Sequence, residues 1–152
     1  MSNDFFILIF FYLFSAISTL GYGFFIKKLI VPKNISFNYG TTRLIGVFGL
    51  TLYSYLSHFL LAHNLIHNSI IFLIGVTFFF ILFKSEFKKK DFKIVFLIFI
   101  LLLVAFFCFK THDDFPYYHF PYTNYLTKFD LIVGVGNHDP SWRSPSSIFY
   151  FN

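Results

Sequence analysis

The chain of 152 residues is 57% hydrophobic and 25% aromatic, and only 12% of its residues carry a charge. A water-soluble domain has about 25% charged residues, so this composition excludes an ordinary soluble domain and indicates a membrane protein. The net charge is +5, but the basic residues flank apolar runs and form no continuous basic face, which argues against nucleic acid as a partner. The single cysteine, Cys108, has no partner within the chain, so the sequence predicts no internal disulfide.

The first apolar run predicts a membrane-spanning helix over residues 5–26. These 22 residues contain no charge. As a helix they span about 33 Å, which is enough for a hydrocarbon core of about 30 Å. The preceding Ser2-Asn3-Asp4 lacks the basic residues of a secretory signal, so we expect a retained anchor.

A second span is predicted over residues 44–62. Gly46 and Gly49 lie near its start, and small residues in a membrane helix are typical of close contact with a neighbouring helix. His58 falls inside this predicted span, where we expect a hydrogen-bonded residue between helices rather than a ligand.

The third and fourth spans are predicted over residues 66–83 and 93–109, where the apolar runs are shorter. Lys84, Lys93 and Lys110 at their ends are expected to extend their ammonium groups to the membrane surface. No predicted span contains a charged residue between its flanks, which favours chemistry at the membrane surface over passage through its interior. The runs together predict an all-α polytopic bundle of about four transmembrane helices.

The basic residues predict the orientation. Nine of the twelve lie in the first and third connections, namely Lys27, Lys28, Lys33 and Arg43, then Lys84, Lys88, Lys89, Lys90 and Lys93. The turn over residues 63–69 has none. Because Lys and Arg are retained on the cytoplasmic side, we expect both basic connections in the cytoplasm. The amino terminus and residues 110–152 are then extracytoplasmic, in a multi-pass protein of the plasma membrane.

Residues 110–147 form an acidic and aromatic segment that carries the densest chemistry of the chain. The adjacent carboxylates of Asp113 and Asp114 repel each other, so one is expected to hold its proton more tightly or to share a cation. Oxygen ligands would favour magnesium or manganese over zinc. A solvated cap on the membrane helices is the alternative interpretation of this pair.

Two further features follow in the same segment. Gly134-Val135-Gly136 predicts a turn rather than a phosphate-binding loop, because a third glycine and a following helix are missing. Residues 148–152 are apolar and follow a hydroxyl-rich stretch, which predicts the start of a fifth helix. We therefore expect the chain to be the amino-terminal part of a longer polytopic protein.

The outer segment also carries a family resemblance. The string His112-Asp113-Asp114-Phe115-Pro116-Tyr117-Tyr118-His119-Phe120-Pro121, followed by Arg143-Ser144-Pro145-Ser146-Ser147, resembles bacterial membrane proteins related to the GT-C glycosyltransferases. The resemblance covers roughly the last forty residues. It implies a polyprenyl-phosphate sugar donor used in cell-surface glycan assembly. Asp113 or Asp114 would then be the catalytic base or metal ligand, and His119, Arg143 and Tyr118 would bind the substrate.

Two alternatives stay open at this point. One is a non-enzymatic polytopic protein, such as a transporter or flippase segment or a structural subunit, whose acidic segment only caps the helices. The other is a glycan enzyme resembling the antigen polymerases. The tyrosines of the segment have a second explanation as well, because Tyr is enriched at membrane surfaces whatever the protein does. Beyond membrane lipid, the partner therefore depends on which alternative holds.

Overall fold

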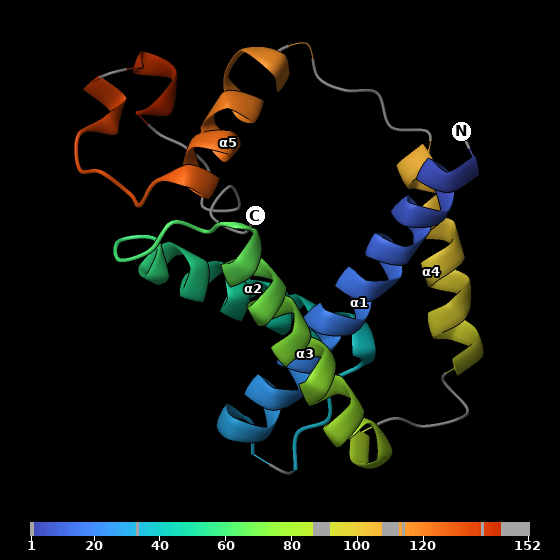
Figure 1. The fold of residues 1–152 in the computed structure, drawn as a ribbon. Helices are drawn as coiled ribbons and strands as arrows, with labels where there is room; N and C mark the ends of the chain where they lie inside the picture. The colour runs from blue at the N-terminus through green and yellow to red at the C-terminus, as the bar shows by residue number, and fades with distance from the viewer. Residues whose placement is uncertain are drawn as a thin grey trace.

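A computed structural model describes residues 2–32, 34–86, 92–107, 113, 115–137 and 139–143. Every regular element in these ranges is helical, which confirms the all-α prediction. The long helices are α1 (Ser2–Ile30), α2 (Tyr39–Ser57), α3 (Leu65–Glu86) and α4 (Phe92–Phe107), drawn in Figure 1. The shorter elements are η2 (Phe115–His119), α5 (Phe120–Lys128), η3 (Val135–Asn137) and η4 (Pro140–Trp142).

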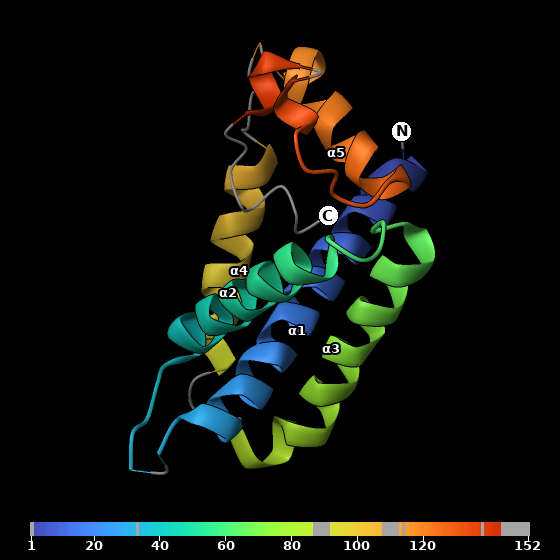
Figure 2. The same cartoon turned by 90° about the vertical axis from the view of Figure 1, so that its left-hand side faces the viewer.

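Helix α1 is the centre of the bundle, and α2 and α3 pack against it (Figure 2). The contact with α3 is close because Gly21 faces Gly75. A Cβ atom on Gly21 would overlap the carbonyl oxygen of Gly75. Two side chains of α1 add hydrogen bonds to backbone oxygens of α3: Ser18 donates over 3.1 Å and Tyr22 over 2.7 Å. Small residues thus let the two backbones approach, as is usual between membrane helices.

The contact between α1 and α2 also depends on small residues. Thr19 and Gly23 of α1 face Thr42 and Gly46 of α2, and the two members of each pair lie four residues apart, on one face of their helix. A Cβ atom on Gly46 would overlap the carbonyl oxygen of Thr19. The close helix contact predicted from Gly46 is confirmed.

Helix α2 covers residues 39–57, whereas the apolar run predicted a helix over 44–62. The reason is its amino-terminal cap: the Asn38 side chain accepts a hydrogen bond from the Thr41 backbone nitrogen over 2.7 Å. Such a cap stabilises a helix start irrespective of apolar content. The earlier start brings Arg43, which precedes the predicted span, into the helix.

Two helices of the described chain are long and apolar enough to cross a membrane: α1 over Phe5–Ile30 and α3 over Leu65–Phe83. Only 22% of the apolar window in α1 and 11% of that in α3 is buried within the protein. Apolar helices that expose most of their surface suggest a membrane protein. Four spans remain a prediction, since α2 contains polar residues and α4 has 16 residues.

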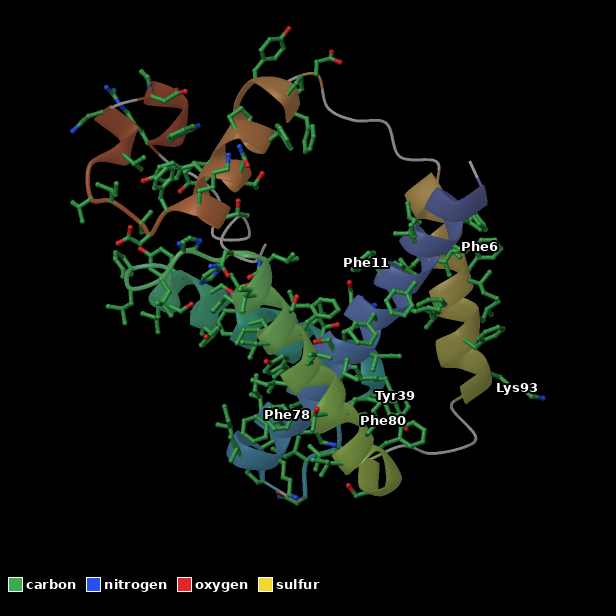
Figure 3. All side chains as sticks on the ribbon, in the orientation of Figure 1. Phe6, Phe11, Tyr39, Phe78, Phe80 and Lys93 are labelled. Carbon is green, nitrogen blue, oxygen red and sulfur yellow. The ribbon has the colours of Figure 1, made fainter. Side chains whose placement is uncertain are left out.

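Helix α4 contacts α1 near Tyr12 and diverges from the amino-terminal end of α1 (Figure 2). The Tyr12 hydroxyl of α1 donates a hydrogen bond to the Phe99 carbonyl over 3.2 Å, and the two rings lie 4.5 Å apart. Lys93 extends away from the bundle at the start of α4, as Figure 3 shows. That position fits the prediction that its ammonium group reaches a membrane surface.

The part after α4, predicted as a loop segment, contains short helices that we call the outer lobe (residues 113, 115–137 and 139–143). Tyr122 and Leu126 of α5 are buried, and Tyr125, Leu131 and Trp142 pack around them. Pro121 is tolerated because it lies in the first turn of α5, where a backbone donor is not needed. The predicted fifth helix over 148–152 lies outside the described residues.

Candidate functional site

A hollow of about 380 Å³ lies between the end of α2 and the outer lobe. This volume falls within the range of about 300–1,000 Å³ usual for small-ligand pockets. Its lining combines aromatic rings with polar groups, contributed mainly by Tyr55, Phe59, Tyr122, Trp142, Asn137 and Arg143. The hollow therefore offers both apolar contact and hydrogen-bond donors to a ligand.

Arg143 is positioned in this hollow by the turn before η3. Gly134 has a backbone φ of +92°, a conformation that side-chain-bearing residues rarely adopt. Gly136 then lies so close to Arg143 that a Cβ atom would be 2.8 Å from the Arg143 Cγ. The Arg143 Nε donates to the Gly136 carbonyl oxygen over 3.2 Å. The predicted turn is confirmed, and it fixes one edge of the guanidinium while the exposed side chain keeps further donors available.

Aromatic packing joins the hollow to α5. The Trp142 ring lies 5.4 Å from the Tyr122 ring and 5.5 Å from the Tyr125 ring. Burial, with a smaller contribution from the nearby Asp130 carboxylate, raises the pKa of Tyr125 above its ordinary value, so this tyrosine stays neutral. Through its contacts with the Tyr122 and Tyr125 rings, Trp142 links η4 to the core of the outer lobe.

The remaining residues predicted for a site are not gathered around this hollow. Asp113 is exposed just before η2, and its carboxylate makes no hydrogen bond or ion pair to the described residues. His119 is partly buried at the end of η2, and Tyr118 lies within η2. Neither Asp113 nor His119 lines the hollow. Asp114 lies outside the described residues.

The described residues hold no group of three His, Cys, Asp or Glu side chains arranged to bind a metal ion. Of the two predicted ligands, the structure describes only Asp113. A magnesium or manganese site at the Asp113–Asp114 pair therefore remains a prediction.

A stack of three histidines, which the sequence did not predict, lies beneath the outer lobe. The ring of His63 is 3.9 Å from that of His58 and 4.2 Å from that of His67. His58 and His63 are almost completely buried, with 0% and 1% of their surface exposed. Ser57 is hydrogen-bonded to the His63 Nε2 over 2.8 Å. The His67 ring is stacked on the His63 ring, whereas the His58 ring is tilted from it by 30°. Within the described residues these three imidazoles are not arranged to bind a metal ion.

Hydrogen bonds assign the proton positions at one end of this stack. The Asn68 amide nitrogen donates to the His63 carbonyl over 2.9 Å, so the Asn68 oxygen accepts from the His67 Nδ1 over 3.1 Å. A neutral His67 then has an acceptor at Nε2, which lies 3.2 Å from the Tyr53 hydroxyl.

The histidine stack also attaches the outer lobe to the bundle. The His63 backbone nitrogen donates to the Leu126 carbonyl over 3.1 Å, and the Leu131 nitrogen donates to the His58 carbonyl over 2.7 Å. His58 lies in the turn after α2, outside the two candidate spans. Burial is the largest influence on it and lowers its pKa below the ordinary value, which also favours the neutral form.

The third polar group of interest is Arg43, at the contact between α1 and α2. Its Nε donates to the Thr19 Oγ1 over 3.1 Å. Thr19 in turn donates to the Ser15 carbonyl over 2.7 Å and is nearly buried. A guanidinium thus lies inside the helix layer, not in the cytoplasmic connection where the apolar runs placed it.

Comparison with protein families gives one match, described as a domain of unknown function, DUF8201, over residues 5–151. The chain belongs to the DUF8201 family. The DUF8201 match covers α1 to α4 and the outer lobe, so the bundle and the hollow are parts of one family domain. No curated protein and no solved structure matched the chain.

Proposed function

We propose that the hollow binds the sugar-phosphate end of a lipid-linked donor, in the membrane part of a glycosyltransferase-like enzyme of cell-surface glycan assembly. The observation that supports this most directly is the pairing of Arg143 with aromatic side chains in one hollow. A guanidinium matches the geometry of a phosphate group. Aromatic rings and a polar amide are suited to hold a sugar or the first carbons of a lipid tail.

The orientation of the chain supports the same proposal. We place the amino terminus and the outer lobe outside the cell, because the basic connections are expected in the cytoplasm. Residues 58–64, between α2 and α3, contain no Lys or Arg. This turn contacts the outer lobe through the His58 and His63 backbones. The hollow then opens at the outer membrane surface, where a polyprenyl-phosphate sugar would be presented.

In this proposal the chemical step belongs to Asp113 and Asp114. A carboxylate can take the proton of an acceptor hydroxyl while a cation neutralises the phosphate leaving group. Because Asp113 lies apart from the hollow, it would act on an acceptor bound beside the donor rather than on the donor's phosphate. A magnesium or manganese ion shared by Asp113 and Asp114 would neutralise the charge of the phosphate leaving group.

The first experiment tests binding. Radiolabelled polyprenyl phosphate is titrated onto the purified full chain in neutral lipid nanodiscs, with polyprenol, which lacks the phosphate, as the reference ligand. A hydrogen bond to a charged group contributes about 1.5–3 kcal/mol, so Arg143→Gln should weaken phosphate binding about tenfold or more. Lys128→Gln, at an exposed lysine of α5, is the matched control. Equal affinities of the two variants would refute the assignment of Arg143.

The second experiment tests the reaction. Membranes containing the full-length gene product are assayed for transfer of a labelled sugar from a polyprenyl-phosphate donor, with and without EDTA. Asp113→Asn or Asp114→Asn should abolish transfer while leaving donor binding intact. Wild-type rates in both variants would refute the catalytic role, and activity in EDTA would refute a metal requirement.

One observation favours the non-enzymatic alternative. Transporters place charged residues within their membrane spans, and Arg43 lies inside the helix layer. In that alternative the hollow would hold a lipid headgroup during passage instead of presenting it for reaction. Donor binding that depends on Arg143, together with no transfer by the wild-type protein, would support it.

A further inference from the structure

The position of Arg43 along the membrane normal is unusual for a charged residue. Its partner Thr19 lies in the candidate span Phe5–Ile30. At 1.5 Å per residue, Thr19 is about 21 Å from the start of that span and about 17 Å from its end. Lys27, which is expected in the cytoplasmic connection, is eight residues or about 12 Å away, so the hydrogen bond places the guanidinium within the apolar part of the span and not at its end.

The chain supplies little to neutralise this charge. Within the described residues, the one hydrogen bond of the Arg43 guanidinium goes to the neutral hydroxyl of Thr19. The sequence contains no Asp or Glu between Phe5 and Ser85, and none in α4. A counter-ion at this depth therefore does not come from the helices α1 to α4.

The guanidinium is accessible to an external partner. The face of α2 that contacts α1 is formed by the buried residues Thr42, Gly46, Leu50 and Ser54. Arg43 lies at the edge of that face and is only partly buried, and its neighbour Leu44 is 70% exposed. The Nε edge of the guanidinium is held by Thr19, and the Tyr12 side chain lies near it. A guanidinium held by one edge can still present its two Nη groups to a planar anion.

We propose that Arg43 is the docking point for a transmembrane helix of a partner, one that carries an Asp or Glu carboxylate at matching depth. Charged residues inside membranes usually pair with one another and face protein rather than lipid. A carboxylate fits the two Nη groups in a bidentate arrangement. A lipid phosphate is the competing ligand, and it lies at the surface of the hydrocarbon core, whereas the guanidinium lies within the apolar part of the span.

The test uses a synthetic transmembrane peptide as the probe. The labelled full chain is reconstituted in phosphatidylcholine vesicles with a Leu/Ala-rich helix that has one central Glu, or with a matched peptide that has Gln. Association is measured by energy transfer. The Glu peptide should bind the wild-type chain about tenfold or more tightly than the Gln peptide does. This preference should disappear in Arg43→Gln and persist in Lys93→Gln, whose lysine lies exposed at the start of α4.

Two further arms keep the result interpretable. Arg43→Lys keeps the charge and should keep part of the preference, which separates charge pairing from loss of fold; helix content by circular dichroism is checked for each variant. Phosphatidylglycerol vesicles test the competing ligand. Loss of the Glu preference in those vesicles, or an unchanged preference in a folded Arg43→Gln chain, would overturn the proposal.

Discussion

Replacing Gly46 by alanine should weaken the contact between α1 and α2. The added Cβ atom would overlap the Thr19 carbonyl oxygen and lie 2.7 Å from the Gly23 nitrogen. Both atoms belong to the backbone of α1, so no side-chain rotation relieves the overlap, and the helices must separate. Gly49→Ala is a matched control three residues along the same helix, because its Cβ atom meets only the end of the flexible Ile26 side chain.

The magnitude follows from two opposing terms. Alanine is more favourable than glycine within a helix by about 1 kcal/mol, and this gain applies to both variants. Overpacking costs about 1–3 kcal/mol, with the upper end expected at Gly46 because backbone atoms are involved. Gly46→Ala should therefore lower the free energy of unfolding by about 2 kcal/mol, whereas Gly49→Ala should leave it unchanged or raise it by up to about 1 kcal/mol.

Thermal unfolding of the purified chain in one detergent, followed by circular dichroism, measures this difference. At about 2–4 °C per kcal/mol for a chain of this size, the two variants should unfold about 4–12 °C apart, with Gly46→Ala at the lower temperature. A Gly46→Ala chain as stable as Gly49→Ala would show that the two backbones are not in close contact.

Two further predictions concern pH and orientation. Because burial lowers the pKa of His58 below 6.5, the unfolded chain binds the proton more readily. The contribution of His58 to the free energy of unfolding should therefore be at its maximum above about pH 6.5, and it should decrease as the pH falls below that value. Thermal unfolding should show a weaker pH dependence in His58→Gln, and equal pH dependence would contradict the assignment. For orientation, in a Cys108→Ser background, an impermeant maleimide applied to intact cells should label Asn137→Cys but not Asn34→Cys; the reverse would overturn the proposed topology.

The sequence predicted α1 and α3 well because both are set by one property, a long run without charge. It misplaced α2 because that helix begins at the Asn38 cap and buries Thr42 and Gly46 against α1. The face of α2 that contacts α1 therefore carries small and polar residues, and a search for apolar residues detects mainly the exposed side of the helix. The signal in the sequence that could have located this start was Asn38, because Asn is a common residue at the amino-terminal cap of a helix.

The candidate site could be predicted only in pieces. Arg143 and the turn at Gly134 were both recognisable, but their contact depends on how η4 folds back over that turn. The helix α5 was missed because Pro116 and Pro121 precede Tyr122, although the four-residue spacing of Tyr122 and Leu126 matched a helix face. The histidine stack was hidden because His58 and His63 lie in the turn between α2 and α3, where spacing in the sequence does not give the distance between side chains.

The hollow takes part of its lining from α2, through Tyr55 and Phe59, and the rest from the outer lobe. The outer lobe is hydrogen-bonded to the His58 and His63 backbones, in the turn that follows α2. Any change in the inclination of α2 relative to the outer lobe therefore alters the separation of the two linings. Thermodynamic linkage then requires the reverse effect: a molecule that fills the hollow restricts the inclinations that α2 can adopt. The coupling free energy is the same in both directions, so the inclination of α2 changes the affinity of the hollow by an equal amount.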